Sequence, residues 1–269
     1  MANPDDASPD VSPPLRMDPA KDANGIPHST ELNSSDADTL VAHLGKSALT
    51  EAQLLHLLER KDLPGTALEE IGRHRDWLRS YRVRRALAFY VRVPRTLAIR
   101  ILRELHLVDL VKLSLAPVAV ADIRRLAEDQ ILSRLGQVTL GEKIALAKRS
   151  SGRVIAALIA EGVPRIFEPA LRNPRLTESQ ILKLLANERL PERAVIGIAS
   201  HPKWEALPNV RLALLRHPHT PLDLAAQILS KVTTPDVKAL GGLKTTSPKL
   251  KQAIKREMAV RKSAEGKKP

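Results

Sequence analysis

The chain has 269 residues, of which 43% are hydrophobic but only 2% aromatic, and its formal net charge is +13. The absence of cysteine excludes disulfides, thiol catalysis, iron–sulfur clusters and cysteine-ligated zinc. A core of leucine, alanine, isoleucine and valine without period-two alternation favours packed helices over a sheet. The longest apolar run, Val154 to Ala160, is too short to cross a bilayer, and residues 1–20 lack a signal-peptide pattern, so we expect a cytoplasmic protein with no membrane partner.

Charge is distributed unevenly along the chain. Residues 1–40 hold eight acids and two bases, whereas residues 244–269 hold nine bases and two acids. Residues 1–35 are rich in Asp, Pro, Ser and Asn and show no apolar period, which predicts a disordered acidic N-terminal segment. An acidic head and a basic body suggest an anionic partner, or a head that folds back on the body.

The first predicted helix runs from Asp36 to Leu44 and ends at Gly45. After it, residues 49–113 align without a gap with residues 176–240, at an offset of 127 residues. The alignment contains 24 identities in 65 positions, which predicts an internal duplication.

Both copies carry the same helix-start signals. Thr50 and Thr177 are each followed three residues later by glutamine, the pattern of a capping box in which side chains satisfy free N–H groups at the helix start. Pro64 and Pro191 are expected at the first position of the next helices, where the missing N–H costs nothing.

Between the two copies, the middle segment 114–175 also has a helical pattern. Helices are predicted over residues 118–135, 140–148, 152–160 and 164–171, and a basic helix over 248–260. Helices this short must pack on neighbours to be stable. We therefore predict an all-α protein, a right-handed α-α superhelix (solenoid) over residues 36–243, followed by a basic C-terminal helix and tail over 244–269.

Two motifs resemble known helical-repeat families. Val-Arg-x-Ala-Leu at residues 83–87 and 210–214 is similar to the second helix of HEAT-like repeats. The turns at 173–177 and 217–221, with Asn-Pro or His-Pro, resemble those of the bacterial leucine-rich repeat variant. The resemblance covers residues 47–243 and implies a helical scaffold that binds a partner.

Three duplicated or paired features allow a structural and a functional interpretation. His74 and His201 each precede a tryptophan by three residues, as equivalent binding positions or as helix ends beside a tryptophan that covers a joint; we favour the second. His217 and His219 have the spacing of a metal pair, but turn residues are favoured, and no metal or cofactor is expected. Arg84 and Arg211 are expected to bond along the stack, with Asp109 and Asp236 as candidate partners or helix caps.

An arginine run from residue 73 to residue 103 contains a single acid, Asp76, and of its arginines the second copy keeps only Arg211. Most of these side chains are therefore not needed to build the repeat, and they form either a solvated face or a site for an anionic partner. The candidate binding residues are Arg73, Arg75, Arg79, Arg82, Arg85, Arg92 and Arg95.

No catalytic motif is present, so the chain is not expected to be an enzyme. The leading hypothesis is a scaffold that binds a protein partner or a regulatory ligand. The alternative is nucleic-acid binding through the basic surface, although only six aromatic residues are available to stack on bases. A third hypothesis, an enzyme of the DNA-alkylation-repeat kind, requires an acid beside an aromatic cleft.

Overall fold

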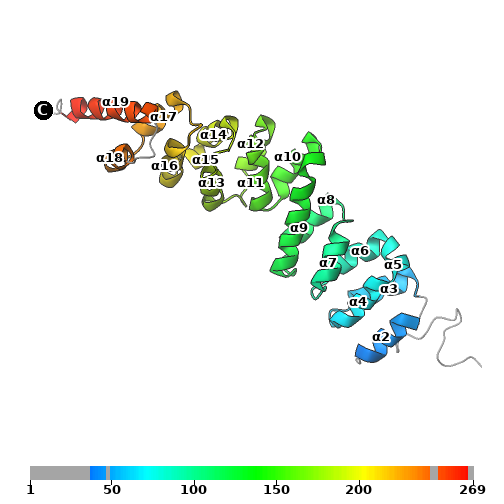
Figure 1. Ribbon diagram of the computed structural model, residues 1–269. Helices are drawn as coiled ribbons and strands as arrows, with labels where there is room; N and C mark the ends of the chain where they lie inside the picture. The colour runs from blue at the N-terminus through cyan, green and yellow to red at the C-terminus, as the bar shows by residue number, and fades with distance from the viewer. Residues whose placement is uncertain (1–36, 47–48, 243–247, 266–269) are drawn as a thin grey trace, which may run out of the picture. The chain divides into compact units, whose positions relative to one another are not determined.

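A computed structural model describes residues 37–46, 49–242 and 248–265, and every regular element within these ranges is a helix (Figure 1). The all-α class is thereby confirmed for the described residues. The predicted disordered segment 1–35 lies outside them. The chain divides into two compact units, one running to Leu87 with residues 92–94 and one comprising residues 88–91 and the chain from Arg95 onward.

Within its described residues, the first unit contains five short helices. They are α2 (Ala37–Lys46), α3 (Glu51–Glu59), α4 (Gly65–Arg73), α5 (Arg75–Arg79) and α6 (Tyr81–Ala88), whose last residue belongs to the second unit. Helix α4 packs against α2 and α5. Leucine and isoleucine side chains from α2, α3 and α4, including Leu44, Leu54 and Ile71, are fully buried and form its core.

The second unit continues with helices of similar length. They are α7 (Arg95–Leu102), α8 (Leu107–Leu115), α9 (Ala121–Arg134), the 3-10 helix η1 (Leu135–Gln137), α10 (Leu140–Arg149), α11 (Gly152–Ala160), α12 (Pro164–Leu171), α13 (Glu178–Leu185), α14 (Glu192–Ala199), α15 (Pro202–Glu205), α16 (Pro208–Arg216), α17 (Leu222–Ser230), α18 (Thr234–Gly242) and α19 (Pro248–Glu265).

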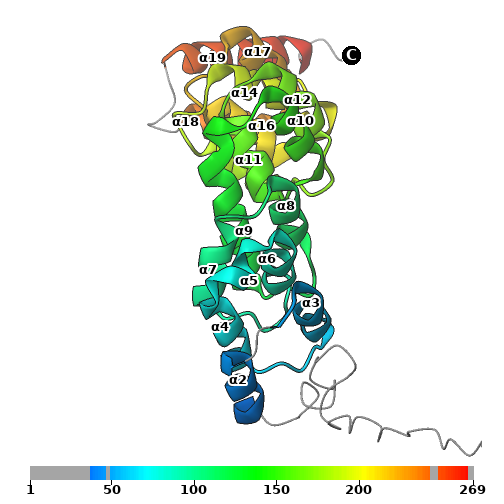
Figure 2. The same cartoon turned by 90° about the vertical axis from the view of Figure 1, so that its right-hand side faces the viewer.

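Alternate helices of this unit lie side by side (Figure 2). Helix α11 packs against α9 and α13, and α13 packs against α16. In a second series α10 packs against α12, and α12 against α14, while α11 also contacts both α10 and α12. Each short helix therefore buries its aliphatic face against neighbours, which compensates for the marginal stability of a helix of two or three turns.

The duplication extends further than the sequence alignment. Helix starts at residues 37, 51, 65, 75, 81, 95, 107 and 121 recur at residues 164, 178, 192, 202, 208, 222, 234 and 248. Each pair differs by 127 residues, so α2–α9 correspond one by one to α12–α19. The packing recurs as well, because α2 contacts α4 as α12 contacts α14, and α9 contacts α7 and α8 as α19 contacts α17 and α18.

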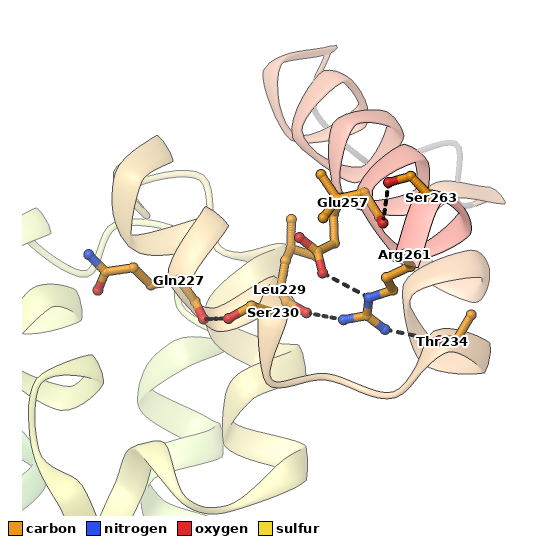
Figure 3. Close-up of polar contacts among 8 residues, drawn as sticks. Gln227, Leu229, Ser230, Thr234, Glu257, Arg261 and Ser263 are labelled. Atoms are coloured by element: carbon orange, nitrogen blue, oxygen red, sulfur yellow. Dashed lines mark hydrogen bonds and ion pairs between the residues drawn. The ribbon is translucent and has the colours of Figure 1, made fainter. Parts of the chain in front are cut away.

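A pair of arginines outside the aligned segments makes equivalent contacts in the two copies. Arg134 donates to the carbonyl oxygens of Leu102 (3.1 Å) and Leu105 (2.7 Å) at the end of α7. Arg261, 127 residues later, donates to the carbonyl of Leu229 at 2.7 Å, near the end of α17 (Figure 3). Both side chains thus satisfy carbonyls that a helix C-terminus leaves free.

The predicted helix boundaries are partly confirmed. The helices expected at 152–160 and 164–171 have these bounds, whereas α9 is shorter than predicted and α19 extends to Glu265. Gly45 does not end its helix, which continues to Lys46; glycine costs only about 1 kcal/mol in a helix, and burial of Leu44 outweighs it. Pro64 and Pro191 are N-cap residues rather than first helical residues, since both are extended, with ψ of 153° and 141°.

Candidate binding surface around Trp77

The capping signals place the first helix of each copy as predicted. In α3, Thr50 Oγ1 accepts from the backbone N–H of Gln53 (3.4 Å), and Gln53 Oε1 accepts from the Thr50 amide (2.9 Å). In α13, Gln180 Oε1 accepts from the Thr177 amide at 3.0 Å. Helices α3 and α13 therefore start at equivalent residues of the two aligned segments, with the same capping pattern.

Trp77 is presented by the five-residue helix α5. His74 ends α4 in an extended conformation, and its ring lies beside the Trp77 indole with the ring centroids 4.2 Å apart. Trp77 is only partly buried. The position of His74 at a helix end is as expected, although its ring lies near the Glu70 carboxylate, and the indole beside it is left with an accessible surface.

Beside Trp77 the surface is hollowed. The hollow has a volume of about 390 Å³ and mixes apolar side chains with polar ones. It is lined by Leu49, Glu51, Leu54, His74, Asp76, Trp77, Ser80 and Val83. All of these residues belong to the first unit, and three of them, Leu49, Leu54 and Val83, are aliphatic side chains of the buried core.

The equivalent region of the second copy is closed. Trp204 is 1% exposed, and its Nε1 donates to the Leu171 carbonyl at 3.0 Å. Lys203, at the position of Asp76, places its Nζ 4.1 Å from the Trp204 ring centroid. Leu207 stands where the first copy has Ser80. The equivalent tryptophans therefore differ in exposure: Trp204 is buried in the second copy, and Trp77 is partly exposed in the first.

The carboxylate near the His74 ring is a further difference between the two copies. Glu70 accepts from Arg73 at 2.8 Å and lies 3.6 Å from His74 Nε2. The equivalent position is Gly197, where a Cβ would lie 2.8 Å from the Phe167 ring, so no acid fits there without a shift of that ring. His201 accordingly has a buried Nδ1 without a hydrogen-bond partner, and burial lowers its pKa.

The structure brings two of the predicted arginines, Arg79 and Arg82, to the rim of this hollow. Arg79 pairs with Asp76 (3.5 Å) and Arg82 with Glu51 (3.7 Å), and both acids line the hollow. Arg73 is held by Glu70. The side chains of these three arginines are 71% to 83% exposed. Exposed pairs of this kind contribute at most about 1 kcal/mol, so a partner can displace them.

The other candidate arginines are not all at the same place. Arg75 is exposed on α5 beside the hollow, and Arg85 is exposed on α6. Arg92 is exposed near Asp62, whose pKa is lowered mainly by its hydrogen bond to Arg60 and further by the charge of Arg92. Arg95 belongs to the second unit and pairs with Asp122 at 3.5 Å. We define the Trp77 surface as the hollow together with Arg73, Arg75, Arg79 and Arg82.

The two turn histidines have structural partners. His217 Nδ1 accepts from the His219 amide (3.2 Å), so its Nε2 carries the proton and donates to the Asn187 carbonyl (3.1 Å). His219 Nδ1 donates to the Leu190 carbonyl at 2.8 Å. Within the described residues no group of three or more His, Asp or Glu side chains is arranged to hold a metal.

Arg211 bonds to neighbouring helices as predicted, but through backbone carbonyls. It donates to Glu205 (2.7 Å) and Lys231 (3.0 Å), whereas Asp236 accepts from the Thr233 hydroxyl at 2.6 Å. Asp109 lies 3.8 Å from Lys112. Asp236 is thus a capping residue at the start of α18, one of the two roles expected for it, while free carbonyls at helix ends are the acceptors of Arg211.

Comparison of the chain with protein-family models, curated proteins and solved structures found no significant match. None of the described helices has the length and apolar character of a membrane span. The resemblance to HEAT-like repeats and the cytoplasmic location both stay predictions.

Proposed function

We propose that this protein is a non-enzymatic scaffold, an α-solenoid of HEAT-like repeats, that binds an acidic segment of a protein partner at the Trp77 surface. The side-by-side packing of alternate short helices in the second unit supports the solenoid, because stacked helix pairs produce that pattern. The scaffold role is supported by exposed arginines and a hollow at one place on the first unit.

The difference between the two copies carries the proposal. The fold of the repeat is satisfied by a buried tryptophan, a leucine at position 207 and a lysine over the ring. The first copy replaces the leucine with Ser80 and the lysine with Asp76, and adds arginines around them. Since the second copy folds without these features, they are free to serve binding.

The chemistry of the surface fits a peptide with an apolar anchor flanked by acids. Tryptophan and arginine are the residues most often found at interface hot spots, where a partner side chain fills a desolvated pocket. An apolar side chain of the partner can rest on the accessible part of Trp77 in the hollow. Carboxylates beside it can pair with the planar guanidinium groups of Arg79 and Arg82 in two-point contacts.

The alternative is a single-stranded nucleic acid. A base can stack on the accessible Trp77 ring, and phosphates can contact the same arginines. The net charge of +13 favours any polyanion. The two partners differ in salt dependence, because release of counterions from several phosphates makes nucleic-acid affinity fall steeply with salt.

The test is affinity capture from lysate by the full chain, with and without nuclease. Ser80→Leu restores the leucine of the second copy and fills the hollow, and Arg75→Ser with Arg79→Ser and Arg82→Ser removes the rim charge. We expect a nuclease-resistant protein that wild type retains and both variants lose. Leu207→Ser is the matched control in the second copy and should retain it.

Two outcomes would decide against the proposal. Partners that vanish on nuclease treatment would favour the nucleic-acid alternative. Partners retained equally by wild type, Ser80→Leu and the triple serine variant would place binding away from the Trp77 surface. Circular dichroism of each variant checks that the helices are intact.

A further inference from the structure

An apolar groove lies between α8 and α10 in the second unit. Its volume is about 180 Å³, and its walls are mainly aliphatic side chains. The lining residues are Leu107, Val108 and Val111 of α8, Ala145 and Leu146 of α10, and Lys112, Glu142 and Arg149 at the edges. We call this feature the α8–α10 groove.

The groove exposes an apolar side chain that a folded protein ordinarily covers, because Val108 is 64% exposed. Leu140, at the start of α10 but not among the lining residues, is 37% exposed. Single exposed aliphatic residues are common, but apolar side chains that gather around a hollow mark interaction sites.

The repeat itself does not need this apolar character. In the second copy, the positions of Leu107, Val108 and Val111 are occupied by Thr234, Pro235 and Lys238 of α18. Helix α18 nevertheless packs on α19 as α8 packs on α9. The aliphatic residues on the outer side of α8 are thus dispensable for the fold, as the arginines around Trp77 are.

The groove also interrupts a regular series of packed helices. Helices α10 and α12 pack against each other, as do α12 and α14, but no comparable packing joins α8 and α10 among the described residues. The walls are two helices, so the groove presents the ridges and depressions into which side chains spaced three or four residues apart on another helix insert.

The charged side chains at the edges of the α8–α10 groove determine which ligands the groove can bind. Lys112 is 58% exposed and 3.8 Å from Asp109, whereas Arg149 is exposed in the last turn of α10. The single acid at the edge, Glu142, accepts from the Thr139 amide (3.0 Å) and hydroxyl (2.7 Å) and is thereby held in the helix cap. The positive charges are available to a ligand, and the negative charge is engaged.

We propose that the α8–α10 groove is a docking site for an amphipathic helix of a partner protein, with apolar side chains in the groove and acidic side chains facing Lys112 and Arg149. Helices that bind in grooves use anchors at positions i, i+3 or i+4, and i+7. The groove lies entirely in the second unit, so it and the Trp77 surface are separate sites whose tests are independent.

The experiment uses the full chain and two labelled synthetic peptides of about 18 residues, long enough to form a helix. Both carry leucines on one face; one carries glutamates beside them and the other carries lysines. Fluorescence anisotropy measures their binding to wild type, to Val111→Lys and to Val118→Thr. Val111→Lys introduces the residue that α18 has at this position, and Val118 is 63% exposed but does not line the groove.

We expect the glutamate peptide to bind wild type and Val118→Thr alike, and to bind Val111→Lys at least about tenfold more weakly. The lysine peptide should bind poorly. Arg149→Glu changes an exposed side chain and should shift the preference toward the lysine peptide. Failure of the glutamate peptide to bind wild type, or equal binding to wild type and both groove variants, would overturn the proposal.

Discussion

Different side chains can satisfy the same kind of turn. The turns that follow α12 and α16 are an example. Asn173 accepts from the Arg175 amide (2.9 Å) and donates to the Ala147 carbonyl (2.8 Å). His217 makes the same two kinds of contact, with the His219 amide and the Asn187 carbonyl. This explains why asparagine and histidine share this turn: each offers an acceptor and a donor.

The histidine version of this turn predicts a pH dependence. Burial, the largest effect, lowers the pKa of His217 below its ordinary value of about 6.5. Below that pH the unfolded chain binds a proton that the folded chain does not, so the stability present at neutral pH decreases toward the lowered pKa. We expect His217→Asn, which keeps both hydrogen bonds, to reduce the loss of stability between pH 7 and 5 in urea unfolding.

The control for this prediction is Val118→Thr, because Val118 is 63% exposed and the change involves no ionisable group. It should leave the pH dependence unchanged. Burial also lowers the pKa of His201, which contributes with the same sign, so the slope in His217→Asn should decrease without vanishing. An unchanged slope in His217→Asn would contradict the neutral, donating state assigned to this side chain.

At the scale of elements, the chain stabilises helices of two or three turns by satisfying their ends. Thr139 and Glu142 form a further capping box at α10, and Thr220 Oγ1 donates to the Leu214 carbonyl near the end of α16. Hydrogen bonds to carbonyl oxygens at neighbouring helix ends are donated by Arg134, Arg211 and Arg261. A side chain on one helix that donates to the free carbonyls of another links the two helices directly.

The arginine at the end of α9 is expected to be important for stability. Arg134→Lys keeps the charge but removes the planar fork that reaches Leu102, Arg103 and Leu105 together. Loss of charged hydrogen bonds to partly buried carbonyls should reduce the free energy of unfolding by roughly 2 kcal/mol. Urea unfolding followed by circular dichroism measures the effect.

Arg125→Lys is the matched control on the same helix, because Arg125 is exposed. It should change stability by less than about 0.5 kcal/mol. Arg261→Lys, which alters the equivalent arginine of α19, should be destabilising in the same direction as Arg134→Lys. Equal stabilities of the Arg134→Lys and Arg125→Lys proteins would show that these carbonyl contacts contribute little.

At the scale of the whole molecule, the main features are the duplication of helices and the uneven distribution of charge. Eight helices recur in order at a constant offset, with the boundary between the two compact units falling inside the first copy. The copies differ in their surfaces: the first has the partly exposed Trp77 and aliphatic residues on the outer side of α8, whereas the second has the buried Trp204 and, on α18, Thr234, Pro235 and Lys238. A duplicated scaffold thus keeps its core pattern in both copies and varies the exposed positions.

The acidic composition of residues 1–35 predicts a competitor for anionic partners. Deleting them should change the melting temperature by less than about 2 °C, because a segment with so few apolar residues contributes little to a core. Affinity for heparin should rise at low salt, and the increase should shrink as salt screens the charges. A fall of many degrees on deletion, or a heparin affinity that does not change, would contradict this prediction.

The sequence by itself determined the helical class, the capping boxes, several helix boundaries and a duplication with 24 identities. These follow from local rules, such as hydrophobic period and capping residues, that act within a few positions. The sequence comparison missed the full extent of the duplication. Among the described residues outside the aligned segments, the copies share only two identities, Leu44 with Leu171 and Arg134 with Arg261. Helices can keep their positions and contacts after their residues have diverged.

Only the tertiary structure decided which side chains are accessible. The sequence marks Trp77 and Trp204 as equivalent, yet Trp77 is partly exposed beside a hollow, whereas Trp204 is sealed and donates to the Leu171 carbonyl. A comparison of the two copies at position 80 was the signal that could have indicated the hollow. The arginine run likewise separated into distinct places, since exposure and grouping depend on how helices pack, and packing joins residues far apart in the chain.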